Sequence, residues 1–430
     1  MSRWLLQGGR VVDPANGRDE TLDLRIEAGH VTALGRLSVL PDETVIDARG
    51  LLVTPGLVDL CVHLREPGFE DIETIRSGAQ AALAGGFTTI AAMPDTDPPV
   101  DSEATVAYIR LKGEAARAAR VYPVGALTQG RQGERLSEMA GMARAGAVAF
   151  SDEAACVDRS VVFLRALRYA RMVGKPVLTR CEDAGLRGQG VASPGLIADM
   201  MALPAIAPGT EEIMVGRNLY LARQEQGPLH LLHLSTAESL RQLVAARERG
   251  VQVSCSVTPH HLLFTEASIE GYPAIYKFRP PLRAEPDRDA LVAGLREGTV
   301  DAISSQHAPR GMGEKNLEFV FAAADCGGLE TTFAVLYTKL VETGALSAQR
   351  LVAALSTAPA RILGTTGGTL AVGAVADVSC FDVTTPWTID PSQFCSRSHL
   401  SPYAGWTVLG RARHVWVGGE ARFLDGQLHR

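Results

Sequence analysis

The sequence predicts an α/β fold: a (β/α)8 barrel of the TIM type, with a small β-sandwich domain formed by both chain termini. From Pro55 onward, short apolar runs alternate with longer stretches whose apolar residues recur three and four positions apart, which is typical of successive βα units. Eight such runs can be placed, and eight is the strand count of a closed barrel. On either side of this region, short runs separated by turn residues indicate antiparallel β-structure.

These changes in the pattern of apolar residues divide the chain into three segments. Residues 1–54 form the first part of the sandwich, residues 55–365 the barrel, and residues 366–430 the second part of the sandwich. The predicted barrel strands are Leu57–His63, Phe87–Met93, Arg120–Leu127, Ala147–Ser151, Pro176–Cys181, Pro228–Leu234, Val251–Val257 and Asp301–Ser305. The clearest predicted helices are Ile75–Ala84, Ser102–Ala118, Arg159–Val173 and Ala237–Gly250. Two long spacers, Glu182–Gln226 and Thr258–Thr299, are expected at the carboxyl-terminal face of the barrel, where insertions shape a site or a partner surface.

The composition limits the classes of protein to which this chain can belong. The 430 residues are 46% hydrophobic and 21% charged, with a net charge of −6, as expected of a folded soluble protein. Lys and Arg are dispersed, so no nucleic-acid partner is expected, and no apolar segment is long enough to predict a membrane partner. The seven cysteines are scattered without a Cys-x-x-Cys pair, which argues against a disulfide framework or a zinc ribbon and favours a cytoplasmic location.

The first predicted barrel strand carries an unusual set of polar residues. Asp59, Cys61, His63 and Arg65 alternate along it, so their side chains share one face. A carboxylate, a thiol, an imidazole and a guanidinium together suit the floor of an active site. Taken alone, the stretch is better explained by a buried thiol and one hydrogen-bonded core histidine.

Other predicted strands also end in polar residues. Besides the first strand, the carboxyl ends carry Asp152, Arg180, His233, and Gln306 with His307. Barrel enzymes build their active sites at this rim, so ligand-type residues arriving there in series form a more specific signal than any one of them. Singly, Asp152 also suits a helix cap, and His233 a core histidine.

A series of motifs resembles the signature of dihydroorotases, which belong to the amidohydrolase superfamily. The motifs are Pro55-Gly56-x-x-Asp59-x-x-x-His63-Leu64-Arg65-Glu66-Pro67-Gly68, Met93-Pro94-Asp95-Thr96, Phe150-Ser151-Asp152, Cys181-Glu182-Asp183, His233-Leu234-Ser235-Thr236, Thr258-Pro259-His260-His261-Leu262, Pro280-Pro281-Leu282-Arg283, His307-Ala308-Pro309 and Gly328-Leu329-Glu330-Thr331. The resemblance covers essentially the whole chain. It implies a metal-dependent barrel that interconverts carbamoyl aspartate and dihydroorotate in pyrimidine biosynthesis.

The chain departs from that family pattern at the metal-binding positions. Of the ligand set that the resemblance implies, His63, Asp152 and His233 are retained. Cys61 stands in place of the first histidine of His-x-His, and Arg180 in place of a histidine before Cys-Glu-Asp.

The third departure is Gln306, which stands in place of the aspartate that serves as metal ligand and general base. Gln306 is neutral and cannot accept the proton of an attacking water. Arg180 is always protonated and cannot donate a lone pair, so we expect it to pair with Asp152 in the place of the metal. No cofactor is therefore expected, although one zinc ion held by Cys61, His63 and Asp152 remains an alternative.

Substrate recognition is altered as well. In the family, an Arg after His-x-His-Leu and an Asn in Met-Pro-Asn-Thr bind the substrate carboxylate; Arg65 is retained, but Asp95 replaces the Asn. A carboxylate facing a carboxylate is repulsive. Arg279, Arg283 and Arg310 are further candidates for binding an anion.

Two functional hypotheses follow. The first is a pseudoenzyme, a dihydroorotase-like protein without catalytic activity that serves as a structural partner of aspartate carbamoyltransferase. This hypothesis rests on the contrast between framework motifs such as Pro280-Pro281-Leu282-Arg283, which are intact, and the metal ligands and general base, which are substituted. The alternative is an active metal-dependent dihydroorotase, or a related amidohydrolase that cleaves a cyclic amide C–N bond, with an altered one-metal site. Self-association into a homo-oligomer is compatible with both.

Overall fold

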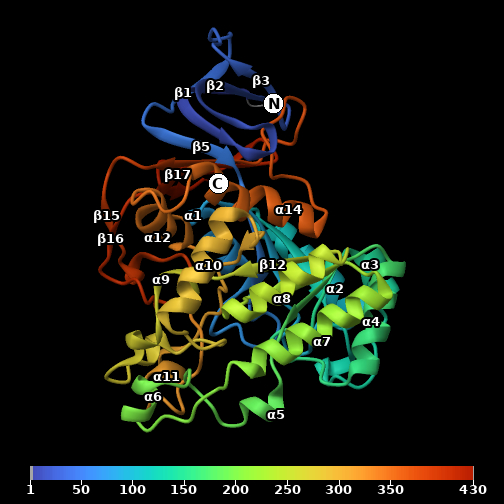
Figure 1. Cartoon of the computed structure of the whole chain (residues 1–430). Coiled ribbons are helices and arrows are strands. Elements are labelled where there is room, and N and C mark those ends of the chain that lie inside the picture. Colours follow the sequence, from blue (N-terminus) through green and yellow to red (C-terminus); the bar gives the residue numbers. More distant parts are fainter. Residues whose placement is uncertain (1–2, 430) are drawn as a thin grey trace.

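The computed structural model describes residues 3–429, and it places a parallel barrel beside a sheet to which both chain ends contribute. Figure 1 shows the N-terminal strands in blue and the C-terminal strands in red together at the top, with the barrel and its helices below. The described barrel strands are β6 (Leu57–Val62), β7 (Phe87–Ala92), β8 (Arg120–Gly125), β9 (Ala149–Phe150), β10 (Val177–Arg180), β11 (Leu229–Leu232), β12 (Val253–Val257) and β13 (Ala302–Ile303). They pair in sequence order as an eight-stranded sheet within the described chain, which confirms the predicted barrel.

The barrel closes between its first and last strands. Val62 forms a parallel bridge with His307, and His63 N donates to His307 O at 2.8 Å. Asp59 strengthens this junction from inside: its carboxylate accepts from Ser304 Oγ at 2.7 Å and from Ser305 N at 2.9 Å. The first residue of the polar face predicted from the sequence therefore has a structural task, which is to hold β6 against the segment after β13.

Helices follow the strands around the barrel. The longer ones are α1 (Ile75–Ala84), α2 (Glu103–Ala116), α3 (Met139–Ala145), α4 (Ser160–Met172), α7 (Gly209–Glu225), α8 (Ala237–Glu248) and α10 (Glu285–Glu297). Shorter ones are α5 (Ala184–Arg187), α6 (Leu196–Met200), α9 (Pro259–Leu263), α11 (Met312–Lys315), α12 (Thr332–Leu336), α13 (Ala348–Val352) and α14 (Ala358–Leu363). Within residues 3–429, no helix combines the length and the apolar character needed to cross a membrane.

Two of the predicted helices, α1 and α2, begin directly after residues that cap them. Thr74 accepts from Ser77 N before α1, and Ser102 accepts from Thr105 N before α2. The long spacer between β10 and β11 contains α5, α6 and α7, and Figure 1 shows α5, α6 and α11 at the end of the barrel away from the terminal sheet. The beginning of this predicted insertion therefore lies at the end of the barrel away from the terminal sheet.

The terminal sheet joins the two ends of the chain. Its strands are β1 (Arg3–Asp13), β2 (Arg18–Glu27), β3 (His30–Gly35), β4 (Glu43–Asp47), β5 (Leu51–Pro55), β14 (Val378–Asp382), β17 (Arg411–Val417), β18 (Glu420–Leu424) and β19 (Gln427–Leu428). Strand β14 lies between β5 and β17 and is antiparallel to both, so residues from the two termini share one core with Val53, Val378 and Trp416. Strands β15 (Trp387–Thr388) and β16 (Thr407–Val408) pair separately.

Candidate functional site

The candidate site residues lie where the sequence predicts, at the carboxyl ends of the barrel strands. Cys61 is in β6 and His63 directly follows that strand; Asp152 follows β9, Arg180 ends β10, His233 follows β11 and Gln306 follows β13. All six side chains are buried. The strand ends therefore bring ligand-type residues and a buried cation to one rim of the barrel.

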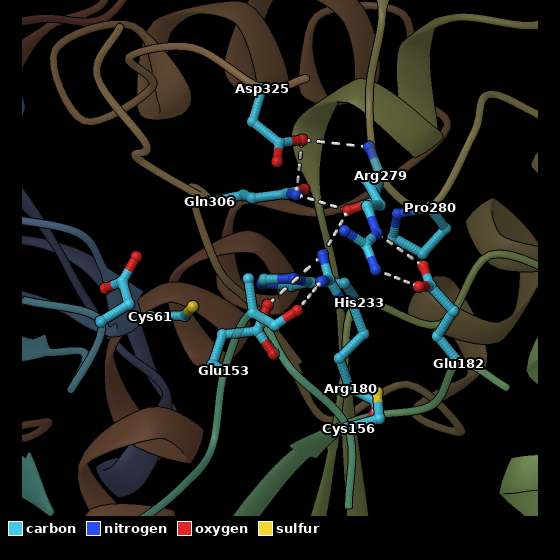
Figure 2. Close-up of polar contacts among 12 residues, drawn as sticks. Cys61, Glu153, Cys156, Arg180, Glu182, His233, Arg279, Pro280, Gln306 and Asp325 are labelled. Carbon is cyan, nitrogen blue, oxygen red and sulfur yellow. Dashed lines mark hydrogen bonds and ion pairs between the residues drawn. The ribbon is translucent and has the colours of Figure 1, made fainter. Parts of the chain in front are cut away.

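Arg180 forms the centre of this site, as Figure 2 shows. Its guanidinium donates to Arg279 O at 3.0 Å and to Ala154 O at 2.8 Å. Its carboxylate partner is Glu153, 3.5 Å away, and each of these two side chains is only 2% exposed. Burial by itself would lower the pKa of Arg180, but Glu153 and Glu182 outweigh that effect and raise it, so the charge is permanent.

The expected pairing of Arg180 with Asp152 is wrong. Asp152 accepts from Leu127 N at 2.8 Å, from Thr128 N at 3.1 Å and from the Thr128 hydroxyl. These three donors come from the loop after β8 and use both carboxylate oxygens. Asp152 therefore holds that loop, while the next residue, Glu153, neutralises Arg180.

The structure also brings together a different group of metal-ligand types from the expected Cys61, His63 and Asp152. Ligand atoms of Cys61, Glu153 and His233 lie within 4.8 Å of one another. Among the described residues, both His233 ring nitrogens and Glu153 Oε2 are buried without a hydrogen-bond partner. Sequence reasoning missed Glu153, although the need of a buried arginine for a buried counter-ion was a signal that could have found it.

The chemistry of this group fits at most one metal ion. A thiolate, a carboxylate and a neutral imidazole are ligands that zinc accepts, and burial holds the pKa of His233 well below its usual value, so its ring is neutral. Burial and Glu153 raise the pKa of Cys61 well above that of a free thiol, so a metal would have to displace its proton. A two-metal centre does not fit, because the fixed charge of Arg180 lies beside the same Glu153.

Gln306, which the resemblance places at the position of the general base, is hydrogen-bonded to the wall of the site. Its side-chain nitrogen donates to Arg279 O at 2.8 Å and to Asp325 Oδ1 at 2.9 Å. Asp325 Oδ1 also accepts from Arg279 N at 3.0 Å, as drawn in Figure 2. The amide therefore links two loops of the rim, and it offers no group that ionises near neutral pH.

The substrate-binding positions implied by the resemblance contact each other. Asp95 Oδ2 lies 2.9 Å from Arg65 Nη1, and Asp95 Oδ1 lies 2.7 Å from His63 Nδ1. Burial would raise the pKa of Asp95, but His63 and Arg65 outweigh that effect and hold the pKa well below its usual range. The ionised carboxylate of Asp95 thus already contacts the guanidinium of Arg65, the group that would bind a substrate carboxylate.

The other candidate anion-binding arginines also have partners inside the chain. Arg279 Nε donates to Glu182 at 2.7 Å. Arg283 Nε donates to Ser235 Oγ at 3.0 Å, and Arg310 Nε donates to Ala324 O at 3.1 Å. Each of these three guanidinium groups therefore has at least one partner within the protein.

Comparisons with known proteins agree with this architecture. A family model described as "Dihydro-orotase-like" matches residues 50–239. The chain is 44% identical over 417 residues to a protein named "Dihydroorotase" from Geobacter metallireducens, covering 97% of this chain and 98% of that protein. It is 39% identical over 421 residues to a protein of the same name from Caldanaerobacter subterraneus, covering 98% of this chain and 97% of that protein.

A solved structure shares the fold over the full length. The structure titled L-hydantoinase (dihydropyrimidinase) from Arthrobacter aurescens superposes with a TM-score of 0.90 at 25% identity, covering 100% of this chain and 98% of that chain. The full-length identity to the proteins named above is well beyond what a shared fold alone requires. The chain belongs to the dihydroorotase family, within the amidohydrolase superfamily.

Proposed function

We propose that this chain is a member of the dihydroorotase family that has lost dihydroorotase catalysis and acts as a structural partner of aspartate carbamoyltransferase. The observation that carries the proposal is the position of Arg180. At a strand end where the family is expected to supply a metal-binding histidine, this chain has a buried guanidinium whose charge is balanced by Glu153. A protein cation thus takes the place of a metal cation.

The chemistry of the remaining groups supports the loss of activity. A catalytic metal lowers the pKa of its bound water to about 7, and a neighbouring carboxylate then accepts the proton. Gln306 cannot accept it, a loss of roughly 10²–10⁴-fold by itself. Asp95 forms an ion pair with Arg65, so a substrate carboxylate could bind Arg65 only after that ion pair is broken.

The partner role rests on what is retained. The barrel, its closure and the family's loop motifs are intact, which is what selection for assembly without chemistry would preserve. The test is co-expression of the full chain with aspartate carbamoyltransferase from the same organism, followed by size-exclusion chromatography. We expect co-elution, and a transferase that is less stable alone. Separate elution, with a transferase equally stable in both preparations, contradicts the proposal.

The second candidate is an active cyclic amidohydrolase with a one-metal site. It is favoured by the relatives named dihydroorotase and by the group of Cys61, Glu153 and His233. These three residues would hold the ion, which when bound would supply a Lewis acid and an acidified water.

This candidate is tested by zinc content and by turnover of dihydroorotate with added zinc. Stoichiometric zinc, with turnover that a chelator removes and that Glu153→Gln abolishes, would establish it. Well-folded protein without zinc and without turnover excludes it and supports the first proposal.

A further inference from the structure

A cavity of about 380 Å³ lies between the barrel and the terminal sheet. The end of α1 and helix α12 line it from the barrel, and β17, β18 and β19 line it from the terminal sheet. Figure 1 shows α1, α12, β17 and the C-terminal end of the chain together in this part of the molecule. Among residues 3–429, none of the six buried rim residues lines it. Pockets that hold small ligands measure roughly 300–1,000 Å³, so this cavity has room for a small molecule.

Aromatic side chains form much of the cavity wall. They are Phe333 of α12, Trp387 of β15, Phe394 a few residues later, and Phe423 of β18. The face of an aromatic ring carries partial negative charge and attracts a cation. Trp387 already shows this attraction, because the guanidinium of Arg411 lies 5.3 Å from the centre of its ring. The wall therefore fits an apolar or aromatic ligand that carries a positive charge.

Glu330 brings to the cavity a carboxylate that no basic side chain balances. It belongs to the Gly328-Leu329-Glu330-Thr331 motif, and it lines the cavity. Its carboxylate accepts from Cys395 N and from Ser396 N, each at 3.0 Å. Burial raises the pKa of Glu330 to about 8, against the effect of these two donors, and the nearby carboxylate of Glu73 adds to the rise. Buried carboxylates in proteins ordinarily have a cationic partner. Such a partner is not supplied by the described part of this chain.

The other charged groups of the lining leave the cavity acidic when Glu330 is ionised. Asp390 also lines it, and hydrogen bonds, first of all from Ser392, hold the pKa of Asp390 below its usual value. Burial raises the pKa of the Cys395 thiol to about 12, so this thiol is neutral. Arg411 lines the cavity as well, but within residues 3–429 it forms no ion pair with either carboxylate. Two carboxylates thus stand against one guanidinium, so a cationic ligand would complete the charge balance.

The lining also contains a donor without an acceptor. Among the described residues, the indole Nε1 of Trp387 is buried without a hydrogen-bond partner. Buried indole N–H groups usually have such a partner. An oxygen atom on the ligand would accept from this N–H.

We propose that this cavity binds a small organic amine. The ammonium contacts the Glu330 carboxylate, the apolar or aromatic body lies between the aromatic walls, and an oxygen of the ligand accepts from Trp387 Nε1. A hydrogen bond between an ammonium and a carboxylate is about twice as strong as one between neutral groups, so Glu330 selects for the amine. This site is independent of chemistry at the rim and of any contact with aspartate carbamoyltransferase.

The test is isothermal titration calorimetry of the full chain with compounds of one shape. Tyramine carries an ammonium and a phenolic hydroxyl. The compound 4-ethylphenol lacks the ammonium, and 3-(4-hydroxyphenyl)propionate has a carboxylate in its place. We expect tyramine to bind and each of the other two to bind at least about tenfold more weakly. Phenethylamine, which lacks the hydroxyl, should bind about three- to tenfold more weakly than tyramine, because it offers no acceptor to Trp387 Nε1.

Variants assign the binding to this cavity. Glu330→Gln removes the charge and keeps the shape, so tyramine should bind at least about tenfold more weakly while 4-ethylphenol is unaffected. Trp387→Phe should remove the advantage of tyramine over phenethylamine. Glu134→Gln changes an exposed carboxylate outside the cavity and should leave every affinity unchanged. Circular dichroism confirms that each variant is folded.

The pH dependence tests Glu330 without any substitution. The ammonium binds the ionised carboxylate, and it stays protonated itself well above pH 7, so the affinity for tyramine should rise about tenfold from pH 6 to pH 7. Glu330→Gln should abolish this rise. The proposal is overturned by tyramine that does not bind, by equal binding of the propionate, or by a flat pH profile. Tyramine binding that Glu330→Gln leaves unchanged would place the amine elsewhere and overturns it as well.

Discussion

The guanidinium of Arg180 lies 3.5 Å from the carboxylate of Glu153, and both side chains are buried at the mouth of the barrel. A lone buried charge is strongly unfavourable, so each residue requires the other. The two residues therefore balance each other's charge within the protein itself.

The first prediction concerns this pair. Glu153→Gln leaves Arg180 charged and without a carboxylate partner, because its guanidinium cannot deprotonate. We expect a loss of about 3–5 kcal/mol in the free energy of unfolding, measured by urea denaturation. Glu134→Gln, an exposed substitution in a nearby loop, should change stability by less than about 0.5 kcal/mol.

The double variant Arg180→Met with Glu153→Gln separates charge from packing. It removes both charges, so it should recover most of the stability lost in Glu153→Gln alone. A single variant as stable as the unmodified protein would mean that the pair does not balance a buried charge.

The second prediction concerns pH and Asp95. The pKa of Asp95 is held far below its unfolded value of about 3.8 by His63 and Arg65, against the effect of burial. A depressed carboxyl pKa adds stability above the unfolded pKa, and that stability is lost as pH falls toward the folded pKa. Asp95→Asn should therefore destabilise the protein at pH 7, and the difference from the unmodified protein should shrink progressively below about pH 4.

Thermal unfolding of both proteins from pH 7 to pH 2.5 measures this difference. Asp97→Asn changes an exposed carboxylate two residues away and should show a small difference that varies little with pH. A deficit in Asp95→Asn that stays constant with pH would show that the lost contact is not ionic.

Apolar patterning predicts where the strands lie, but it does not predict which side chains contact one another. Strand β6 begins at Leu57, as predicted, and ends at Val62, one residue before the predicted end. The agreement is close because the apolar pattern of the sequence follows the burial of the strand. The arrival of Cys61, Arg180 and Gln306 at one rim follows from strand order alone.

Side-chain partners were harder to predict. Arg180 pairs with Glu153 and not with Asp152. Both carboxylate oxygens of Asp152 already accept hydrogen bonds from the backbone of Leu127 and from the backbone and hydroxyl of Thr128. Those donors lie 24 and 25 positions earlier in the chain, in a loop whose path no local spacing reveals. The contact of Asp95 with Arg65 escapes local patterning for a similar reason, because the two residues are 30 positions apart in the chain.

The third prediction concerns the closure of the barrel. Asp59→Ala removes the acceptor for Ser304 Oγ, Ser305 N and Cys61 N, and leaves two buried backbone donors unsatisfied. Each such donor costs roughly 1–3 kcal/mol, so we expect a loss of about 3 kcal/mol or more in the free energy of unfolding. Asp71→Ala, at an exposed residue, is the control and should be nearly neutral. Equal denaturation midpoints for the two variants would contradict a closing role for Asp59.

The fourth prediction concerns restoration of a metal site. Cys61→His, Arg180→His and Gln306→Asp together return family-type ligands to the rim and remove the fixed charge. We expect this triple variant to bind zinc, measured by elemental analysis after dialysis. Omitting Arg180→His should weaken zinc binding at least about a hundredfold, because a positive charge about 4 Å from a cation repels it by several kcal/mol at intermediate dielectric.

Adding Asp95→Asn to the triple variant frees Arg65 for a substrate carboxylate. Turnover of dihydroorotate should then rise above that of the triple variant, with the gain mainly in KM, because the change affects substrate binding more than the reacting atoms. A folded triple variant that binds no zinc would show that the surroundings of the ligands, and not the ligands alone, have diverged. In that case Glu153, left without Arg180, is the first residue to replace, since its unpaired carboxylate would distort the restored site.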